Sequence, residues 1–211
     1  MNEEFKNRIA ELLMSRRTAL IVVDVQNDFC APEGAFGRKG FDLSHVERSV
    51  ANLVPFIDRC RKSGMPVLFV RTFHGDWTDS SSWLWRLGGL NKQTPVCRTN
   101  SWGAGFYKVE PEDNDFIVTK HRFSGFSGTD LDLVLRSRGV ETLFFTGVTT
   151  NVCVETTARD GFNLNYNVVL VEDCCGAFTP EEHASTVVNM NKYFGVACNS
   201  AMLLQLMESP T

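Results

Sequence analysis

The sequence predicts an α/β fold in which a parallel, doubly wound sheet is covered by helices on both faces, giving three layers. Short apolar runs rich in β-branched and aromatic residues recur along the chain, at about 19–23, 67–70, 116–118, 143–145, 168–171 and 194–197. Segments with helical spacing separate these runs, and strands that alternate with helices are typical of parallel sheets. A length of 211 residues suits one sizeable domain and is short for two, so we expect a single domain over 1–211.

In the first half of the chain, the pattern predicts a helix at about 4–15, a strand at 19–23, a loop at 30–42, a helix at 43–63 and a strand at 67–70. Apolar residues at helical spacing support both helices, and Ser63 with Gly64 forms a stop signal for the second one. Because residues 30–42 are rich in Gly and Pro, we expect them to have no regular structure.

The stretch at about 72–114 shows little periodicity and holds all four tryptophans, Trp77, Trp83, Trp85 and Trp102. A loop this long within a compact domain is usually functional. The tryptophans suit either the wall of a small pocket or a contact between subunits, and the contact is at least as good an interpretation for Trp83 and Trp85. A third strand, at 116–118, follows this stretch.

In the second half, the pattern predicts a helix that begins at Thr129, a strand at 143–145, a short helix at 152–158, a strand at 168–171, a helix at 180–192, a strand at 194–197 and a helix at 201–207. Gly147 is expected to break the strand at 143–145. Glu172 and Asp173 are expected to end the next strand, with Cys174 and Cys175 as buried small residues after it.

The composition excludes several classes of function. The formal net charge of −4 leaves no basic surface for nucleic acid, and no apolar run approaches the length of a membrane span. The seven cysteines are scattered and odd in number, and no secretory segment precedes them. We therefore expect a cytoplasmic protein with reduced thiols and neither a nucleic-acid nor a membrane partner.

Three chemically active residues each lie just past the end of a predicted strand, namely Asp24, Lys120 and Cys153. The carboxyl ends of parallel strands meet at one edge of a sheet, where α/β proteins form their binding crevice. Simpler interpretations remain open from the residues alone. Asp24 can cap the following turn, Lys120 can lie on the surface, and Cys153 can be an inert core thiol.

Taken together, the three residues form a sensible set for nucleophilic catalysis. Cys153 is predicted in the first turn of a helix, where the helix dipole and free N–H groups favour a thiolate. Asp24 would accept the thiol proton, and Lys120 would hold the carboxylate and favour the thiolate. The thiolate would attack a carbonyl carbon, and backbone N–H groups near Thr149 and Cys153 would bind the oxyanion.

The strings DVQNDFC (24–30), VTKHRFSGF (118–126), TGVTTNVCVETTARD (146–160) and LVEDCCGA (170–177) resemble the isochorismatase-like cysteine hydrolases over about residues 16 to 204. The resemblance implies a Rossmann-like α/β/α fold, with Cys153 as nucleophile and Asp24 and Lys120 as the other members of a triad. It also implies a cis peptide bond between Val148 and Thr149, with the N–H groups of Thr149 and Cys153 as the oxyanion hole.

Differences among members of the family suggest the substrate. Nicotinamidases of this family bind a metal through an Asp and several His, but here Thr72 stands where that Asp would fall, so we expect no metal and no cofactor. Isochorismatases that split an ether generally lack the nucleophilic cysteine. Residues 122–162 look most like ureidoacrylate amidohydrolases, whereas EDCCGA resembles biuret hydrolases and N-carbamoylsarcosine amidohydrolases. A small ureido or carbamoyl substrate is therefore expected, although Phe123 replaces a Tyr usual in the ureidoacrylate enzymes.

The candidates for contact with the substrate are Gln26, Asn27, His74, Trp102, Phe123 and Ser124. Each of them also suits ordinary packing or turn capping. The resemblance further implies a homodimer or homotetramer in which a neighbouring loop can close the site.

Other classes of function remain as alternatives. They are an isochorismatase-type ether hydrolase in which Cys153 is a bystander, an amidase for another small amide such as nicotinamide or maleamate, and a non-catalytic binding protein on the same fold. A redox thiol protein is disfavoured because the sequence has no Cys-x-x-Cys motif.

Overall fold

The structure is a computed structural model, and it describes residues 7, 9–10, 17–86 and 96–208. Residues 7, 9 and 10 are helical, and the rest of the helix predicted at about 4–15 lies outside the described residues. Within the described ranges no helix is both long enough and apolar enough to span a bilayer.

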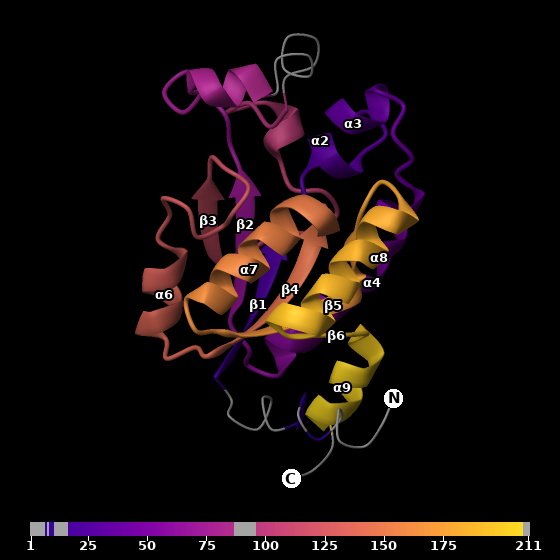
Figure 1. The fold of residues 1–211 in the computed structure, drawn as a ribbon, viewed down its shortest axis with the longest axis vertical. Helices are drawn as coiled ribbons and strands as arrows, with labels where there is room; N and C mark the ends of the chain where they lie inside the picture. The colour runs from indigo at the N-terminus through magenta and orange to yellow at the C-terminus, as the bar shows by residue number, and fades with distance from the viewer. Residues whose placement is uncertain (1–6, 8, 11–16, 87–95, 209–211) are drawn as a thin grey trace.

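A six-stranded parallel sheet forms the centre of the molecule and confirms the predicted fold class (Figure 1). Its strand order is β3-β2-β1-β4-β5-β6. The strands are β1 (Thr18–Val23), β2 (Val67–Thr72), β3 (Phe116–Lys120), β4 (Thr142–Val148), β5 (Asn167–Gly176) and β6 (Val196–Cys198). Every predicted strand is present, and β1 and β4 lie side by side in the middle because their residues are apolar on both faces.

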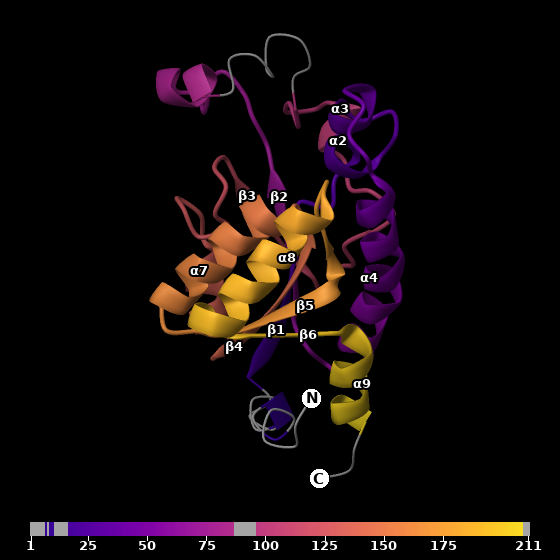
Figure 2. The ribbon, with the colours of Figure 1, turned by 45° about the vertical axis from the view of Figure 1, so that its right-hand side comes forward.

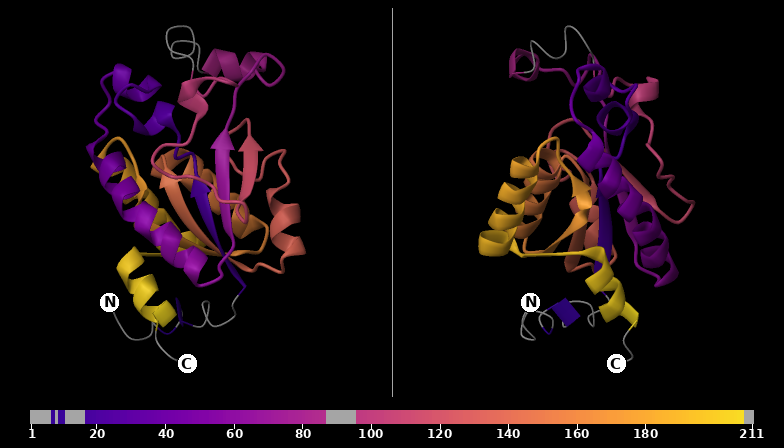
Figure 3. Two further views of the ribbon diagram at one scale, coloured as in Figure 1. Left: turned by 180° about the vertical axis from the view of Figure 1, so that it is seen from behind. Right: turned by 90° about the vertical axis from the view of Figure 1, so that its right-hand side faces the viewer.

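Helices cover both faces of the sheet, as Figures 2 and 3 show. These helices are α4 (Ser44–Lys62), α6 (Leu131–Ser137), α7 (Glu155–Asn163), α8 (Pro180–Asn189) and α9 (Ser200–Glu208), whereas α2 (Asn27–Cys30) and α3 (Ala35–Arg38) lie above the carboxyl edge of the sheet. α4 and α9 pack on one face and α6, α7 and α8 on the other. Alternating residues of β1 serve the two cores: Leu20 faces α4, and Ile21 faces the opposite layer.

Two predictions of irregular structure were wrong. The segment predicted as a loop at 30–42 contains the end of α2 and all of α3. The buried carboxylate of Asp28 stabilises this compact form, because it accepts hydrogen bonds from the backbone N–H groups of Ala35 (3.0 Å) and Cys97 (2.6 Å). The stretch at 72–114 likewise includes a short helix at 81–86 and a 3-10 turn at Trp102–Ala104.

The predicted ends of β4 and β5 were too early. β4 runs through Gly147 to Val148, and β5 runs through Glu172 and Asp173 to Gly176. A register shift in the β4–β5 pairing after Phe145 lets both strands continue. The Asp173 carboxylate is accommodated because it accepts hydrogen bonds from the backbone and hydroxyl of Ser200, each at 2.7 Å, at the start of α9. Cys174 and Cys175 therefore lie inside β5.

Candidate active site

Asp24 follows β1 at the centre of the carboxyl edge of the sheet. Its backbone has φ of 51°, in the left-handed region that Asp tolerates better than most residues, and its side chain is fully buried. The neighbouring Gly147 of β4 has φ of 108°, and a Cβ there would overlap the Val23 carbonyl oxygen. The glycine thus permits the close approach of β1 and β4 beside Asp24.

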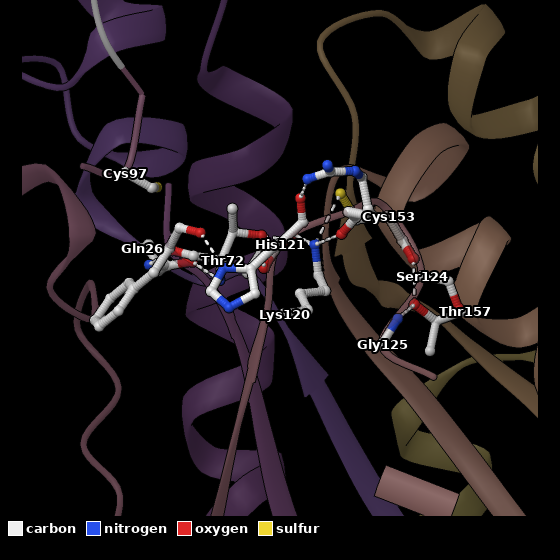
Figure 4. Close-up of polar contacts among 12 residues, drawn as sticks. Gln26, Thr72, Cys97, Lys120, His121, Ser124, Gly125, Cys153 and Thr157 are labelled. Carbon is white, nitrogen blue, oxygen red and sulfur yellow. Dashed lines mark hydrogen bonds and ion pairs between the residues drawn. The ribbon is translucent and has the colours of Figure 1, made fainter. Parts of the chain in front are cut away.

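Lys120, the last residue of β3, reaches across the edge of the sheet to Asp24, and Figure 4 shows it between Thr72 and Cys153. Its Nζ lies 2.8 Å from Asp24 Oδ2, and it donates hydrogen bonds to Thr72 Oγ1 (2.6 Å) and the Arg122 carbonyl oxygen (3.0 Å). Thr72 Oγ1 donates to Asp24 Oδ1 at 2.9 Å. Burial disfavours the Lys120 ammonium, but the charge of Asp24 and the contact with Cys153 outweigh it, so the pKa of Lys120 is raised above its usual value.

Cys153 completes the group, with its Sγ 3.5 Å from Lys120 Nζ (Figure 4). It does not lie in the first turn of an ordinary α-helix: Thr150–Val154 forms a π-helical turn, and α7 begins after it. Thr157 of α7 braces this turn by donating to the Cys153 carbonyl oxygen (2.6 Å) and accepting from the Gly125 N–H (3.0 Å). The structure thus brings together the three residues that the sequence singled out.

The protonation of Cys153 differs from the sequence expectation of a favoured thiolate. Burial raises the pKa of the Cys153 thiol well above its usual value. The positive charge of Lys120 lowers that pKa, but not enough, and the negative charge of Asp24 adds to the rise. Cys153 is therefore a neutral thiol at neutral pH, and a base beside it must remove the proton during attack.

A cavity of about 310 Å³ opens onto Cys153. Its polar lining includes Lys120, which contacts the Cys153 sulfur, and Thr72, Thr149 and Asn151. Its aromatic lining consists of Phe29, Phe36, Trp83, Phe123 and Phe178. His74, Arg86, Val96, Arg122, Val152 and Glu182 complete the lining. Such a volume and a mostly apolar wall suit a small organic molecule.

Of the six candidates for substrate contact, His74 and Phe123 line the cavity. Gln26, Asn27, Trp102 and Ser124 are not among the lining residues. Gln26 is fully buried and uses its amide to hold backbone: it donates to the carbonyl oxygens of Thr72 (3.0 Å) and Ala104 (2.8 Å) and accepts from the Thr72 N–H (2.7 Å). Asn27 Nδ2 donates to the Trp102 carbonyl oxygen at 2.8 Å, and Ser124 Oγ accepts from the Phe126 N–H at 3.1 Å.

Sequence reasoning missed several lining residues. Thr72, interpreted only as the replacement of a metal ligand, joins Asp24 to Lys120. Its place at the end of β2, on the same edge as Asp24 and Lys120, was the signal that could have found it. Asn151, two residues before Cys153, has a buried Oδ1 without a hydrogen-bond partner in the described structure. Phe29, Phe36 and Phe178 gave no local signal, because only the tertiary fold brings them to the cavity.

The peptide bond between Val148 and Thr149 is cis, at the position that the resemblance implies. In the ranges 17–86 and 96–208, no three His, Cys, Asp or Glu side chains form a group suited to a metal ion. His74 packs against Trp83, with ring centroids 4.9 Å apart, and burial lowers its pKa to about 4.

A parallel α/β sheet with Asp, Lys and Cys in contact at the carboxyl ends of β1, β3 and β4 is the arrangement of a cysteine hydrolase. The model of the isochorismatase domain matches residues 18–202, and the chain belongs to this family.

Its relatives include the ureidoacrylate amidohydrolase RutB of Methylobacterium radiotolerans, 36% identical over 195 residues, with 84% of this chain and 74% of that protein covered. Among solved structures, a cysteine hydrolase from Pseudomonas syringae pv. phaseolicola superposes with a TM-score of 0.81 at 29% identity, covering 92% of this chain and 93% of the other. The N-carbamoylsarcosine amidase of Thermoplasma acidophilum gives a TM-score of 0.70 at 26% identity, covering 87% and 96%.

Proposed function

We propose that this protein is a cysteine amidohydrolase that cleaves a C–N bond of a small ureido or carbamoyl compound and releases ammonia. The contact network of Asp24, Lys120 and Cys153 at the base of the cavity carries the proposal. The similarity to ureidoacrylate amidohydrolases and to N-carbamoylsarcosine amidase supports the choice of substrate.

The reaction begins with transfer of the Cys153 proton to Asp24. Because the resting thiol is neutral, this transfer accompanies attack of the sulfur on the carbonyl carbon of the substrate. Lys120 remains a cation throughout, since its pKa is raised. The positive charge of Lys120 stabilises the negative charge both when it is on the Asp24 carboxylate and when it is on the Cys153 sulfur. The hydrogen bonds of Thr72 keep Asp24 and Lys120 in position.

The tetrahedral oxyanion would be bound by the backbone N–H groups of Thr149 and Cys153, at the π-helical turn that borders the cavity. Asp24 then returns the proton to the departing nitrogen, and ammonia leaves while a carbamoyl thioester stays on Cys153. A water molecule deprotonated by Asp24 attacks this thioester and frees the enzyme. The released carbamic acid loses carbon dioxide to give the amine.

The decisive experiment measures ammonia release from ureidoacrylate, biuret, N-carbamoylsarcosine, nicotinamide and maleamate. We expect turnover of a ureido or carbamoyl compound by the wild type and none by Cys153→Ala. Intact-protein mass spectrometry after rapid acid quench should detect the carbamoyl adduct on Cys153. The buried Cys175→Ala serves as a matched control, because Cys175 lies inside β5 and donates to the Phe145 carbonyl oxygen. Turnover that survives Cys153→Ala would refute the mechanism and favour the ether hydrolase.

We also propose that the protein works in the cytoplasm as a homodimer or homotetramer. All seven cysteines are free and buried, which suits a reducing compartment. Trp77 and Trp85 are exposed on the segment above the sheet, and large exposed aromatic side chains are typical of subunit contacts. Light scattering of the wild type and of a Trp77→Ser/Trp85→Ser variant tests this, since a monomeric wild type would exclude it.

A further inference from the structure

Two groups of aromatic side chains flank the cavity beyond the reactive sulfur. The first aromatic cluster consists of Phe29, Phe36 and Phe178; ring centroids are 5.6 Å apart for Phe29–Phe36 and 4.8 Å for the stacked pair Phe36–Phe178. The second aromatic cluster consists of His74, Trp83 and Phe123, with Trp83 4.9 Å from His74 and 5.2 Å from Phe123. All six residues line the cavity.

The topology of the sheet sets these clusters on opposite sides of the cavity. The second cluster comes from the segments that follow β2 and β3, at one side of the sheet. The first cluster comes from α2 and α3, which follow β1, and from the loop after β5. In Figure 1, α2 and α3 and the magenta segment after β2 stand apart above the carboxyl edge of the sheet. Cys153 follows β4 and lines the same cavity as both clusters, so a molecule bound at its sulfur is within reach of both.

The polar groups that suit a ureido head gather near the sulfur. Asn151 lies on the same π-helical turn as Cys153, and its buried Oδ1 has no partner in the described structure and can accept from a ureido N–H; Thr149 directly precedes this turn. Farther out, the polar side chains are less available to a ligand. The Arg122 guanidinium donates to the Thr78 carbonyl oxygen (3.1 Å) and to Ser80 Oγ (3.3 Å) and lies over the Trp83 ring.

Away from the sulfur, the cavity lining holds two cations, Arg86 and Arg122, and one anion, Glu182, so its net charge is small and positive. Burial lowers the pKa of His74 to about 4, so this side chain is neutral at pH 7. Arg86 and Glu182 have opposite charges. Phe123 also lacks the hydroxyl of the Tyr that is usual at this position in ureidoacrylate enzymes. The part of the cavity beyond the ureido head is therefore built for an apolar, flat group.

We propose that the substrate is a ureido compound whose other end is an uncharged aromatic group, held between the two aromatic clusters, with Phe36 and Phe123 as specificity-determining residues. The proposal rests on the amidohydrolase function above and narrows its substrate class. It differs from a carboxylate-bearing substrate, whose anion would meet mostly aromatic walls, with Arg86 and Arg122 as the cations of the lining away from the sulfur. Burial of an aromatic ring in such a site should raise kcat/KM roughly 10- to 100-fold over a methyl group.

The test compares four compounds that share the ureido head: phenylurea, benzylurea, methylurea and ureidoacrylate. Ammonia release gives kcat/KM for each, and calorimetry with Cys153→Ala gives Kd without turnover. We expect phenylurea or benzylurea to exceed methylurea by at least tenfold in both measurements, and to exceed ureidoacrylate. Equal values for methylurea and the aromatic compounds, or a clear preference for ureidoacrylate, would overturn the proposal.

Variants separate the clusters from general effects on folding. Phe36→Ala should lower the ratio of kcat/KM for the aromatic compound to that for methylurea about tenfold. Phe123→Tyr, which restores a hydroxyl, should shift preference toward ureidoacrylate. Phe162→Ala is the control, because Phe162 is a half-exposed residue of α7 outside the cavity lining, and the ratio should not change. An unchanged ratio in Phe36→Ala with normal thermal unfolding would refute the role of the first cluster.

The failure of this proposal is distinguishable from failure of the proposed function. Cys153-dependent turnover of ureidoacrylate or biuret without any aromatic preference would keep the amidohydrolase and reject the aromatic substrate. If no compound is turned over, the Kd values for Cys153→Ala still decide the question. Equal Kd for methylurea and benzylurea then rejects the aromatic site, whereas tighter binding of benzylurea supports it.

Discussion

The hydroxyl of Thr72 links the two charged members of the triad, and its removal should have a large effect for so small a change. Thr72 Oγ1 donates to Asp24 Oδ1 at 2.9 Å and accepts from Lys120 Nζ at 2.6 Å, and all three side chains are buried. Thr72→Val keeps the shape of the side chain and deletes both hydrogen bonds. The fully buried Asp24 carboxylate then loses this donor to its Oδ1.

The size of the effect follows from the charges. A hydrogen bond to a charged group contributes about 1.5–3 kcal/mol, and leaving a buried charged acceptor unpaired costs at least a similar amount. Because the Lys120–Asp24 ion pair at 2.8 Å remains, part of this loss is recovered. We expect the free energy of unfolding to fall by about 2–4 kcal/mol. If about 1.4–2.7 kcal/mol of this interaction energy also stabilises the transition state of the reaction, its removal lowers kcat/KM roughly 10- to 100-fold.

The assay is ammonia release from the best substrate of the panel, with urea denaturation of the same preparations. Thr72→Ser retains the hydroxyl and is the matched control, so it should recover most of the activity. If Thr72 has only a structural role, Thr72→Val should lower the stability without changing the pH profile of kcat/KM. If Thr72 acts through Asp24, the acidic limb of that profile should shift. A Thr72→Val enzyme within threefold of the wild type in kcat/KM, with an unchanged profile, would refute the reasoning.

Two further predictions concern stability. Gly147→Ala should lower the free energy of unfolding by about 3 kcal/mol or more, because a Cβ at φ of 108° overlaps the Val23 carbonyl oxygen, while Gly75→Ala, whose Cβ would meet only ordinary contacts, should be nearly neutral in urea denaturation. Stability should also fall as the pH drops from about 6.5 to 4. Burial lowers the pKa of His74 and of His183 from 6.5 to about 4, so in this range the unfolded chain binds protons that the folded chain does not. Urea titrations at several pH values give the slope of the free energy of unfolding against pH, which reports the number of protons taken up on unfolding. His183→Gln should lower this number by up to about one, and an unchanged slope would contradict the assignment to His183.

The strands and their chemistry were predictable because they depend on local sequence. An apolar run such as Leu143–Phe145 can be satisfied only in the interior, and alternation of strands with helices restricts the sheet to parallel topology. Asp24, Lys120 and Cys153 could be grouped for the same reason, since each follows a strand and all parallel strands end at one edge. The resemblance to cysteine hydrolases then supplied the roles that spacing alone left open.

Tertiary contacts decided what the local pattern could not. The ordering of residues 27–38 depends on Asp28, whose carboxylate binds the N–H of Cys97, far away in the sequence. β5 continues through Glu172 and Asp173 because β4 and Ser200 provide partners for it. The protonation of Cys153 was also misjudged, since burial outweighs the favourable charge of Lys120.

The sequence by itself therefore determined the fold class, the strands and the three reactive residues, because burial and periodicity act on neighbours along the chain. Only the tertiary structure decided that Thr72 joins Asp24 to Lys120, that the Gln26 amide binds backbone groups, and that six aromatic side chains from separate segments line one cavity. These features depend on contacts between segments that are distant in sequence. Such contacts are set by the packing of the whole sheet and its helices, and no local pattern encodes them.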